Sequence, residues 1–311
     1  MADSSKKPIA VYGAMAANAF IAVTKFIAAA LTGSSAMLSE GIHSVVDTGN
    51  QSLLLLGIHL SKKPADETHP FGHGKELYFW GLIVAIILFG VGGGMSLYEG
   101  ITHFQHPSEL GDPLWNYVVL GIAFVAEGIS FGIALREFSH ARGKEPFWKA
   151  IHTSKDPSIF VVLFEDFAAL TGLVIAALGV FLSHTFQSPL YDGIASILIG
   201  ILLGSIAVLL AYESRQLLLG ESASQGTVQG ILNLAEGEPN VKVVKKPYTM
   251  HFGPDEILLN LSVQFSEGLS GKAMVQAVND LEKNIQNEYP TVKYIFIEAE
   301  SIAQTNLSED G

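Results

Sequence analysis

Six long apolar segments constrain the fold of this chain more than any other feature of its sequence. Each is about as long as the roughly 20 residues that an α-helix needs to cross a bilayer. The segments are approximately 8–31, 36–60, 78–101, 114–136, 158–183 and 189–212. Only 15% of all residues are charged, whereas soluble domains average about 25%. We therefore predict an α-helical membrane protein with six transmembrane helices.

Positively charged residues lie in alternate connections between these segments. They occur before the first segment and at or after the ends of the second, fourth and sixth, namely Lys6, Lys7, Lys62, Lys63, Lys75, Arg136, Arg142, Lys144, Lys149, Lys155 and Arg215. The other three connections contain neither Lys nor Arg. Connections rich in Lys and Arg usually stay in the cytoplasm, so both chain termini are predicted to be cytoplasmic.

The composition becomes more polar after residue 213, where the apolar segments end. The apolar spacing predicts helix 226–235, strands 241–250 and 256–265, helix 271–288 and strand 292–299. This αββαβ order is typical of a small ferredoxin-like α+β domain. We therefore predict a transmembrane domain over 1–213 and a cytoplasmic domain over 214–311.

Composition and absent motifs argue against several functions. The chain has no Cys, so a site for a soft metal must use His and carboxylates. The net charge of −12 argues against nucleic acid as a partner, since nucleic-acid binding needs a basic face. No phosphate-binding loop or His-Glu-x-x-His motif is present, which argues against direct use of ATP and against an intramembrane metalloenzyme.

Ionisable residues inside the apolar segments are candidates for a functional site, because a charge in the hydrocarbon region is costly. They include Lys25, Glu40, His43, Asp47, Glu127, Glu165, Asp166 and Asp192. His43 and Asp47 are four residues apart and therefore share one helical face. An imidazole with two or three carboxylates can bind a divalent cation such as Zn²⁺ and can take up protons when the ion leaves. Alternatively, His43 is an ordinary packed histidine and the carboxylates pair with Lys25.

A second polar cluster follows the second apolar segment. Asp66, His69 and His73 have a spacing compatible with another zinc-type site, close to the membrane surface. Alternatively, these side chains cap the turns of the loop, which Pro70 and Gly72 shape.

Two stretches resemble motifs of the cation diffusion facilitator family: the sequence from Ser34 to Asp47, and His69-Pro-Phe-Gly-His73-Gly-Lys75. With the six segments and the C-terminal domain, the resemblance covers nearly the whole chain. It implies a homodimer in the lipid bilayer that exports Zn²⁺, or alternatively Mn²⁺, Fe²⁺ or Co²⁺, in exchange for protons by alternating access. It also implies a bacterial inner membrane and no enzymatic activity. A metalloenzyme or a metal-sensing receptor remains the alternative.

The resemblance also implies ligands for the ions. By position, His43 and Asp47 correspond to the family's ligands on the second helix, and Asp166 corresponds to the second ligand on the fifth. The family's loop site corresponds to Asp66, His69 and His73. Besides the transported Zn²⁺, the resemblance allows a structural Zn²⁺.

One position departs from the family pattern. The first ligand of the fifth helix falls on Val162, which has no ligand atom. The transport site is therefore expected either to have three protein ligands and a water, or to recruit a neighbour such as Glu165 or Asn50.

Overall fold

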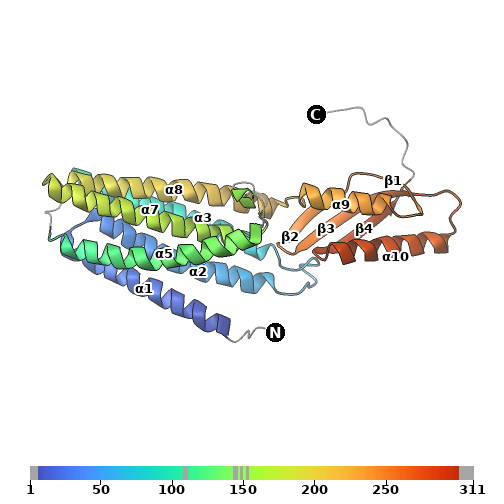
Figure 1. Ribbon diagram of the computed structural model, residues 1–311, viewed down its shortest axis with the longest axis horizontal. Helices are drawn as coiled ribbons and strands as arrows, with labels where there is room; N and C mark the ends of the chain where they lie inside the picture. The colour runs from blue at the N-terminus through green and yellow to red at the C-terminus, as the bar shows by residue number, and fades with distance from the viewer. Residues whose placement is uncertain (1–5, 108–110, 143–145, 148–149, 152–153, 301–311) are drawn as a thin grey trace, which may run out of the picture. The chain divides into compact units, whose positions relative to one another are not determined.

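The computed structural model describes residues 6–107, 111–142, 146–147, 150–151 and 154–300 (Figure 1). The chain forms two compact units, which are described separately. The helical unit comprises 1–60 and 76–215, and the sheet unit comprises 61–75 and 216–311. The loop 61–75 thus belongs to the sheet unit, although the predicted division of the chain placed it in the transmembrane domain.

Long helices build the helical unit and coincide with the six apolar segments. They are α1 (Lys6–Thr32), α2 (Ser35–Ser61), α3 (Glu76–Ile87), η1 (Leu88–Gly93), α4 (Gly94–Gln105), α5 (Leu114–Arg142), α7 (Pro157–Thr185) and α8 (Leu190–Leu219). Helix α3, the π-helical turn η1 and α4 follow one another without a break.

Four stretches of the described chain are long and apolar enough to cross a membrane. They are Glu76–Gln105, Leu114–His140, Phe160–Thr185 and Leu190–Leu219. The described apolar part of α1, Asn18–Thr32, is shorter. Helix α2 is not among the four, because polar residues such as Glu40, His43 and Asp47 lower its hydropathy. Four of the six predicted spans therefore meet this criterion in the structure.

Glycines allow the third apolar segment to pack directly on the backbone of α8. A Cβ atom on Gly93 would lie 3.1 Å from the backbone nitrogen of Gly204, and one on Gly100 would lie 2.7 Å from that of Ile197. On the α8 side, a Cβ on Gly200 would lie 2.8 Å from the backbone nitrogen of Leu97. Small residues are used in this way for close helix packing in membranes.

The sheet unit contains α9 (Gln225–Glu236), β1 (Val241–Val244), β2 (Tyr248–Gly253), β3 (Glu256–Phe265), α10 (Gly271–Glu288) and β4 (Val292–Ala299). Strands β1 and β2 pair antiparallel with successive parts of one edge of β3, as shown by the pairs Val244↔Val263 and Tyr248↔Asn260. Strand β4 pairs parallel with the other edge. The predicted strand 241–250 is therefore two strands, since Pro247 between them has no N–H for the ladder.

Alternating side chains of β3 and one face of each helix form the core of the sheet unit. The buried residues of this core include Ile231, Ala235, Ile257, Leu259, Leu261, Val263, Phe265, Ala277, Leu281, Ile285 and Val292. The strict alternation from Ile257 to Phe265 is the pattern of a strand with one covered face.

Candidate metal sites

Helix α2 places His43 and Asp47 together inside the helical unit. The His43 side chain is 1% exposed and that of Asp47 is 10% exposed. Their Nε2 and Oδ2 atoms are 3.4 Å apart, as expected for residues four positions apart on one helical face.

Several buried polar atoms on this face have no hydrogen-bond partner among the described residues. They are Glu40 Oε1, His43 Nδ1, His43 Nε2, Asp47 Oδ1 and Asn50 Oδ1. We call Glu40, His43, Asp47 and Asn50 the α2 row, because their spacing places them along one side of the helix. A buried polar atom without a hydrogen bond is destabilising. The nitrogen and oxygen atoms of this row could gain such bonding by coordinating a cation or by binding protons.

Helix α7 meets the α2 row through Glu165. Asn50 Nδ2 donates a 2.6 Å hydrogen bond to Glu165 Oε1. Asp166, by contrast, accepts a 2.8 Å hydrogen bond from Ser130 Oγ of α5. Neighbouring residues on a helix point about 100° apart, which explains why one carboxylate faces α2 and the next faces α5.

The predicted transport ligands are thus only partly brought together. Within the described ranges, only the loop cluster has three or more His, Asp or Glu ligand atoms all within 4.8 Å of one another. The structure pairs His43 with Asp47 and connects the α2 row to Glu165, but it does not gather Asp166 into one such group. The role of Asp166 as a ligand stays a prediction.

Replacing Glu165 with glutamine tests whether this residue completes the site in place of Val162. We expect Zn²⁺ affinity to fall by about tenfold, because a charged ligand becomes a neutral amide of the same shape. Isothermal titration calorimetry of the detergent-solubilised protein measures this change. Asp166→Asn is the matched comparison: a larger loss there, with none in Glu165→Gln, would assign the ligand to Asp166 instead.

The alternative in which Lys25 pairs with the carboxylates is observed for Glu40. Lys25 Nζ lies 3.0 Å from Glu40 Oε2 and 2.8 Å from Ser44 Oγ. None of the hydrogen bonds or ion pairs found for the described residues connects Lys25 to His43, Asp47 or Glu165, so Lys25 makes no direct polar contact with them.

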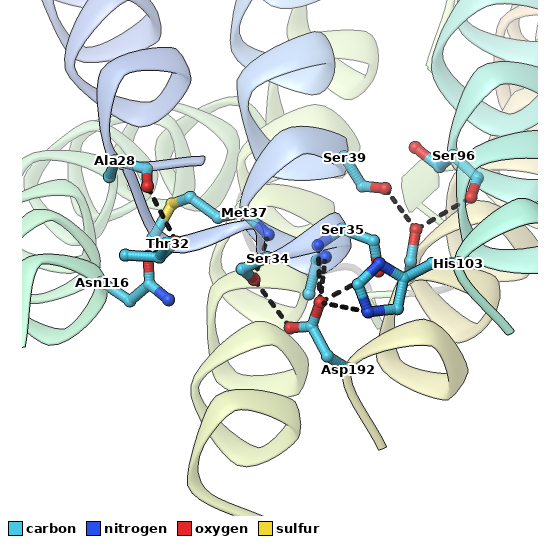
Figure 2. Close-up of polar contacts among 12 residues, drawn as sticks. Ala28, Thr32, Ser34, Ser35, Met37, Ser39, Ser96, His103, Asn116 and Asp192 are labelled. Carbon is cyan, nitrogen blue, oxygen red and sulfur yellow. Dashed lines mark hydrogen bonds and ion pairs between the residues drawn. The ribbon is translucent and has the colours of Figure 1, made fainter. Parts of the chain in front are cut away.

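A second buried cluster joins the start of α2 to α4 and α8 (Figure 2). Asp192 accepts hydrogen bonds from Ser34 Oγ at 2.6 Å and from the Ser35 backbone N–H at 2.5 Å, and also from Ser35 Oγ and the Ala36 N–H. His103 Nε2 lies 3.9 Å from Asp192 Oδ2. The carboxylate therefore caps the N-terminus of α2 from another helix.

Sequence reasoning did not find this cluster as a unit. Asp192 and His103 stand near the ends of apolar segments, where polar residues are common. Their shared position at connections without Lys or Arg was the one available signal, and it does not specify a contact.

The loop of the sheet unit holds the other predicted cluster in a compact arrangement. His69 Nδ1 and His73 Nε2 each lie 3.4 Å from a different oxygen of Asp66. The two imidazole rings have centroids 4.2 Å apart. The structure therefore brings all three predicted loop residues together with the spacing of a metal site.

Local hydrogen bonds keep Asp66 ionised. The Thr68 hydroxyl and the backbone N–H groups of His69 and Thr68 donate to its Oδ1. These bonds, that of the Thr68 hydroxyl first, lower the pKa of Asp66 to about 2. The capping interpretation of the loop therefore holds for Asp66 Oδ1, whereas Asp66 Oδ2 faces His73.

Aromatic contacts fix this loop to the sheet. The ring of Phe71 lies 5.0 Å from that of Phe252 and 5.2 Å from that of Tyr294. Lys75 Nζ lies 5.0 Å from the centre of the Phe252 ring and donates to the Leu218 carbonyl. Gly72 has φ +79°, a conformation that favours glycine.

His69→Ala is expected to weaken Zn²⁺ binding in the loop by about tenfold or more, because it removes one of two imidazole ligands. Transport should slow but persist, since His43 and Asp47 remain. Paired measurements of Zn²⁺ titration and vesicle transport check both effects. Complete loss of transport would instead place the loop on the obligatory ion path.

Apolar helices with a buried His–carboxylate pair mark a candidate ion site in a membrane protein. The chain belongs to the cation efflux family, because the cation efflux transmembrane domain matches residues 11–219. The description of this family, cation efflux, agrees with the predicted class of transporter.

Individual relatives support this assignment. The chain is 37% identical over 243 residues to the human proton-coupled zinc antiporter SLC30A9, mitochondrial, covering 78% of this chain and 43% of the human protein. It is 28% identical to metal tolerance protein C4 of Arabidopsis thaliana, covering 96% and 75% of the two chains. It is 26% identical to the cation-efflux pump FieF of Escherichia coli, covering 90% and 91%. The chain thus spans less than half of the human relative.

The predicted location in a bacterial inner membrane, with the termini in a bacterial cytoplasm, is wrong. Relatives from human, mouse and Xenopus laevis at 36% to 37% identity are mitochondrial proteins by name. The bacterial pump FieF is less similar, at 26%. The bacterial membrane was inferred from the family resemblance, and a family shared by bacterial and mitochondrial proteins does not identify the membrane, which explains the error.

Proposed function

We propose that the protein exchanges Zn²⁺ for protons across a membrane, with His43 and Asp47 as central ligands of the transported ion. The observation that carries this proposal is the set of buried imidazole and carboxylate atoms on α2 that make no hydrogen bond to another described residue. The name of the human relative, a proton-coupled zinc antiporter, supports it.

Exchange follows from the chemistry of these ligands. Metal binding requires a neutral imidazole and ionised carboxylates, so the ion and protons compete for the same atoms. Glu165 and Asp166 add two carboxylates on α7 that can take part in the same competition. Zn²⁺ suits an imidazole–carboxylate set, and it binds such ligands more strongly than Mn²⁺ or Fe²⁺.

We further propose that six helices span the membrane and that the sheet unit is ferredoxin-like. Helices α1 and α2 are each 27 residues long, which is sufficient for a span. The order α9, β1–β2, β3, α10, β4 fits the sheet proposal. We also propose a homodimer, which light scattering of the detergent-solubilised protein tests by its mass.

Proteoliposomes containing the purified chain test the exchange. An imposed proton gradient should drive ⁶⁵Zn²⁺ across the membrane, and Asp47→Ala should abolish this flux. A Zn²⁺ flux that does not depend on the proton gradient would contradict antiport. Parallel assays with Mn²⁺, Fe²⁺ and Co²⁺ would reassign the cargo if one of them outcompetes Zn²⁺.

A further inference from the structure

Lys25 occupies an unusual environment in the helical unit. It is the one Lys or Arg that is fully buried among the residues described in the structure, with 0% exposure. Its ammonium contacts Glu40 Oε2 at 3.0 Å and Ser44 Oγ at 2.8 Å. A carboxylate oxygen and a hydroxyl therefore hold a positive charge inside the bundle.

These two partners flank the proposed ion ligand His43 on α2. Glu40 precedes His43 by three residues and Ser44 follows it directly. The ammonium is thus held next to the ligands of a doubly charged ion. At this range the two positive charges repel each other, and the repulsion is strong where solvent does not screen it.

Glu40 itself has unused bonding capacity. Its Oε1 is buried without a hydrogen-bond partner. The same atom fills the space that a Cβ on Gly172 of α7 would occupy. Since Asn50 contacts Glu165 further along the same two helices, His43 and Asp47 lie between two contacts of α2 with α7.

We propose that Lys25 is a built-in competitor of the transported cation, and that Glu40 is a further ligand shared between the ammonium and the ion. This inference rests on the proposed function of His43 and Asp47. When the ion is absent, Lys25 neutralises Glu40. When the ion is bound, the ammonium lowers its affinity and so favours its release.

If the Lys25–Glu40 ion pair only stabilises the fold, replacing Lys25 with a neutral residue should not strengthen Zn²⁺ binding. Removing one partner of a buried pair leaves an uncompensated charge and destabilises the fold, without strengthening zinc binding. If Lys25 competes with the ion, the same substitution should tighten Zn²⁺ binding. The repulsion between the ammonium and the ion is then lost, and Glu40 Oε2 becomes free to bind the ion.

Isothermal titration of Zn²⁺ into the full chain in detergent separates these cases. All variants carry His69→Ala, so that the loop cluster contributes little. We expect Lys25→Met to lower the Kd by about tenfold or more, since removing a nearby positive charge is worth at least about 1.4 kcal/mol. Lys62→Met, in the exposed loop, is the matched control and should leave the Kd unchanged.

A second pair of variants decides the proposal even if Lys25→Met alone does not fold. Glu40→Gln leaves the ammonium without its carboxylate and should raise the Kd by about tenfold. Adding Lys25→Met to Glu40→Gln replaces the ion pair by neutral groups of similar size and should lower the Kd again. A double variant that binds Zn²⁺ no more tightly than Glu40→Gln overturns the competitor role.

Failure of the underlying function has a different signature. If the parent protein shows no Zn²⁺ binding that Asp47→Ala removes, then the proposed transport site is wrong and not merely the role of Lys25.

Discussion

Replacing Asp47 with alanine is expected to abolish zinc transport while the protein stays folded. Changes to groups outside the ligand shell already cost about 10–100-fold in metal affinity, and Asp47 is a proposed ligand itself. Its Oδ1 has no hydrogen-bond partner, so the substitution removes little that holds the helices together. ⁶⁵Zn²⁺ flux into proteoliposomes measures transport, and thermal unfolding measures stability.

The matched control for this variant is Asp255→Ala, which changes an exposed aspartate in the turn between β2 and β3. It should transport zinc at the parental rate. If Asp47→Ala transports Zn²⁺ at the wild-type rate, the α2 row is not part of the ion path. If the variant does not fold, Asp47 has a structural role.

Asp192→Ala is expected to cause the largest loss of stability among the substitutions considered. The buried carboxylate accepts four hydrogen bonds from Ser34, Ser35 and Ala36. Its removal leaves buried donors unpaired at the positive end of the α2 helix dipole, and losses of about 3–5 kcal/mol are typical for broken buried charge contacts. Differential scanning fluorimetry in detergent should therefore show a markedly lower midpoint.

Asp156→Ala provides a matched control, because Asp156 caps its own helix α7 at a more exposed position. It accepts a 2.9 Å hydrogen bond from the Ser158 N–H, and loss of such a cap costs about 1 kcal/mol. Equal destabilisation by the two substitutions would show that the contact between α2 and α8 adds nothing beyond ordinary capping.

Much of the fold could be predicted because hydrophobic periodicity is a local property. The ranges of the long helices and of α9, β3, α10 and β4 follow from apolar spacing alone. The break at Pro247 was missed because the β-prone residues on both sides of it were interpreted as one strand. The placement of loop 61–75 was also missed, since its contacts with Phe252 and Tyr294 join positions far apart in the sequence.

The candidate sites were predictable to a smaller extent. His43 with Asp47, and Asp66 with His69 and His73, are close in sequence, so their spacing predicted their proximity. Contacts between helices were not predictable in this way. Whether Glu165 or Asp166 faces α2 depends on the rotation of α7, and periodicity does not fix that rotation between two adjacent carboxylates.

The glycine contacts between α4 and α8 have a mechanical consequence. Where two backbones touch, no side chain can change its rotamer to permit sliding, and separation would open a void in the packing. These two helices should therefore move as one rigid body during the transport cycle. The conformational changes that open the site to each side of the membrane in turn would then occur in the other helices, including α2, which carries His43 and Asp47.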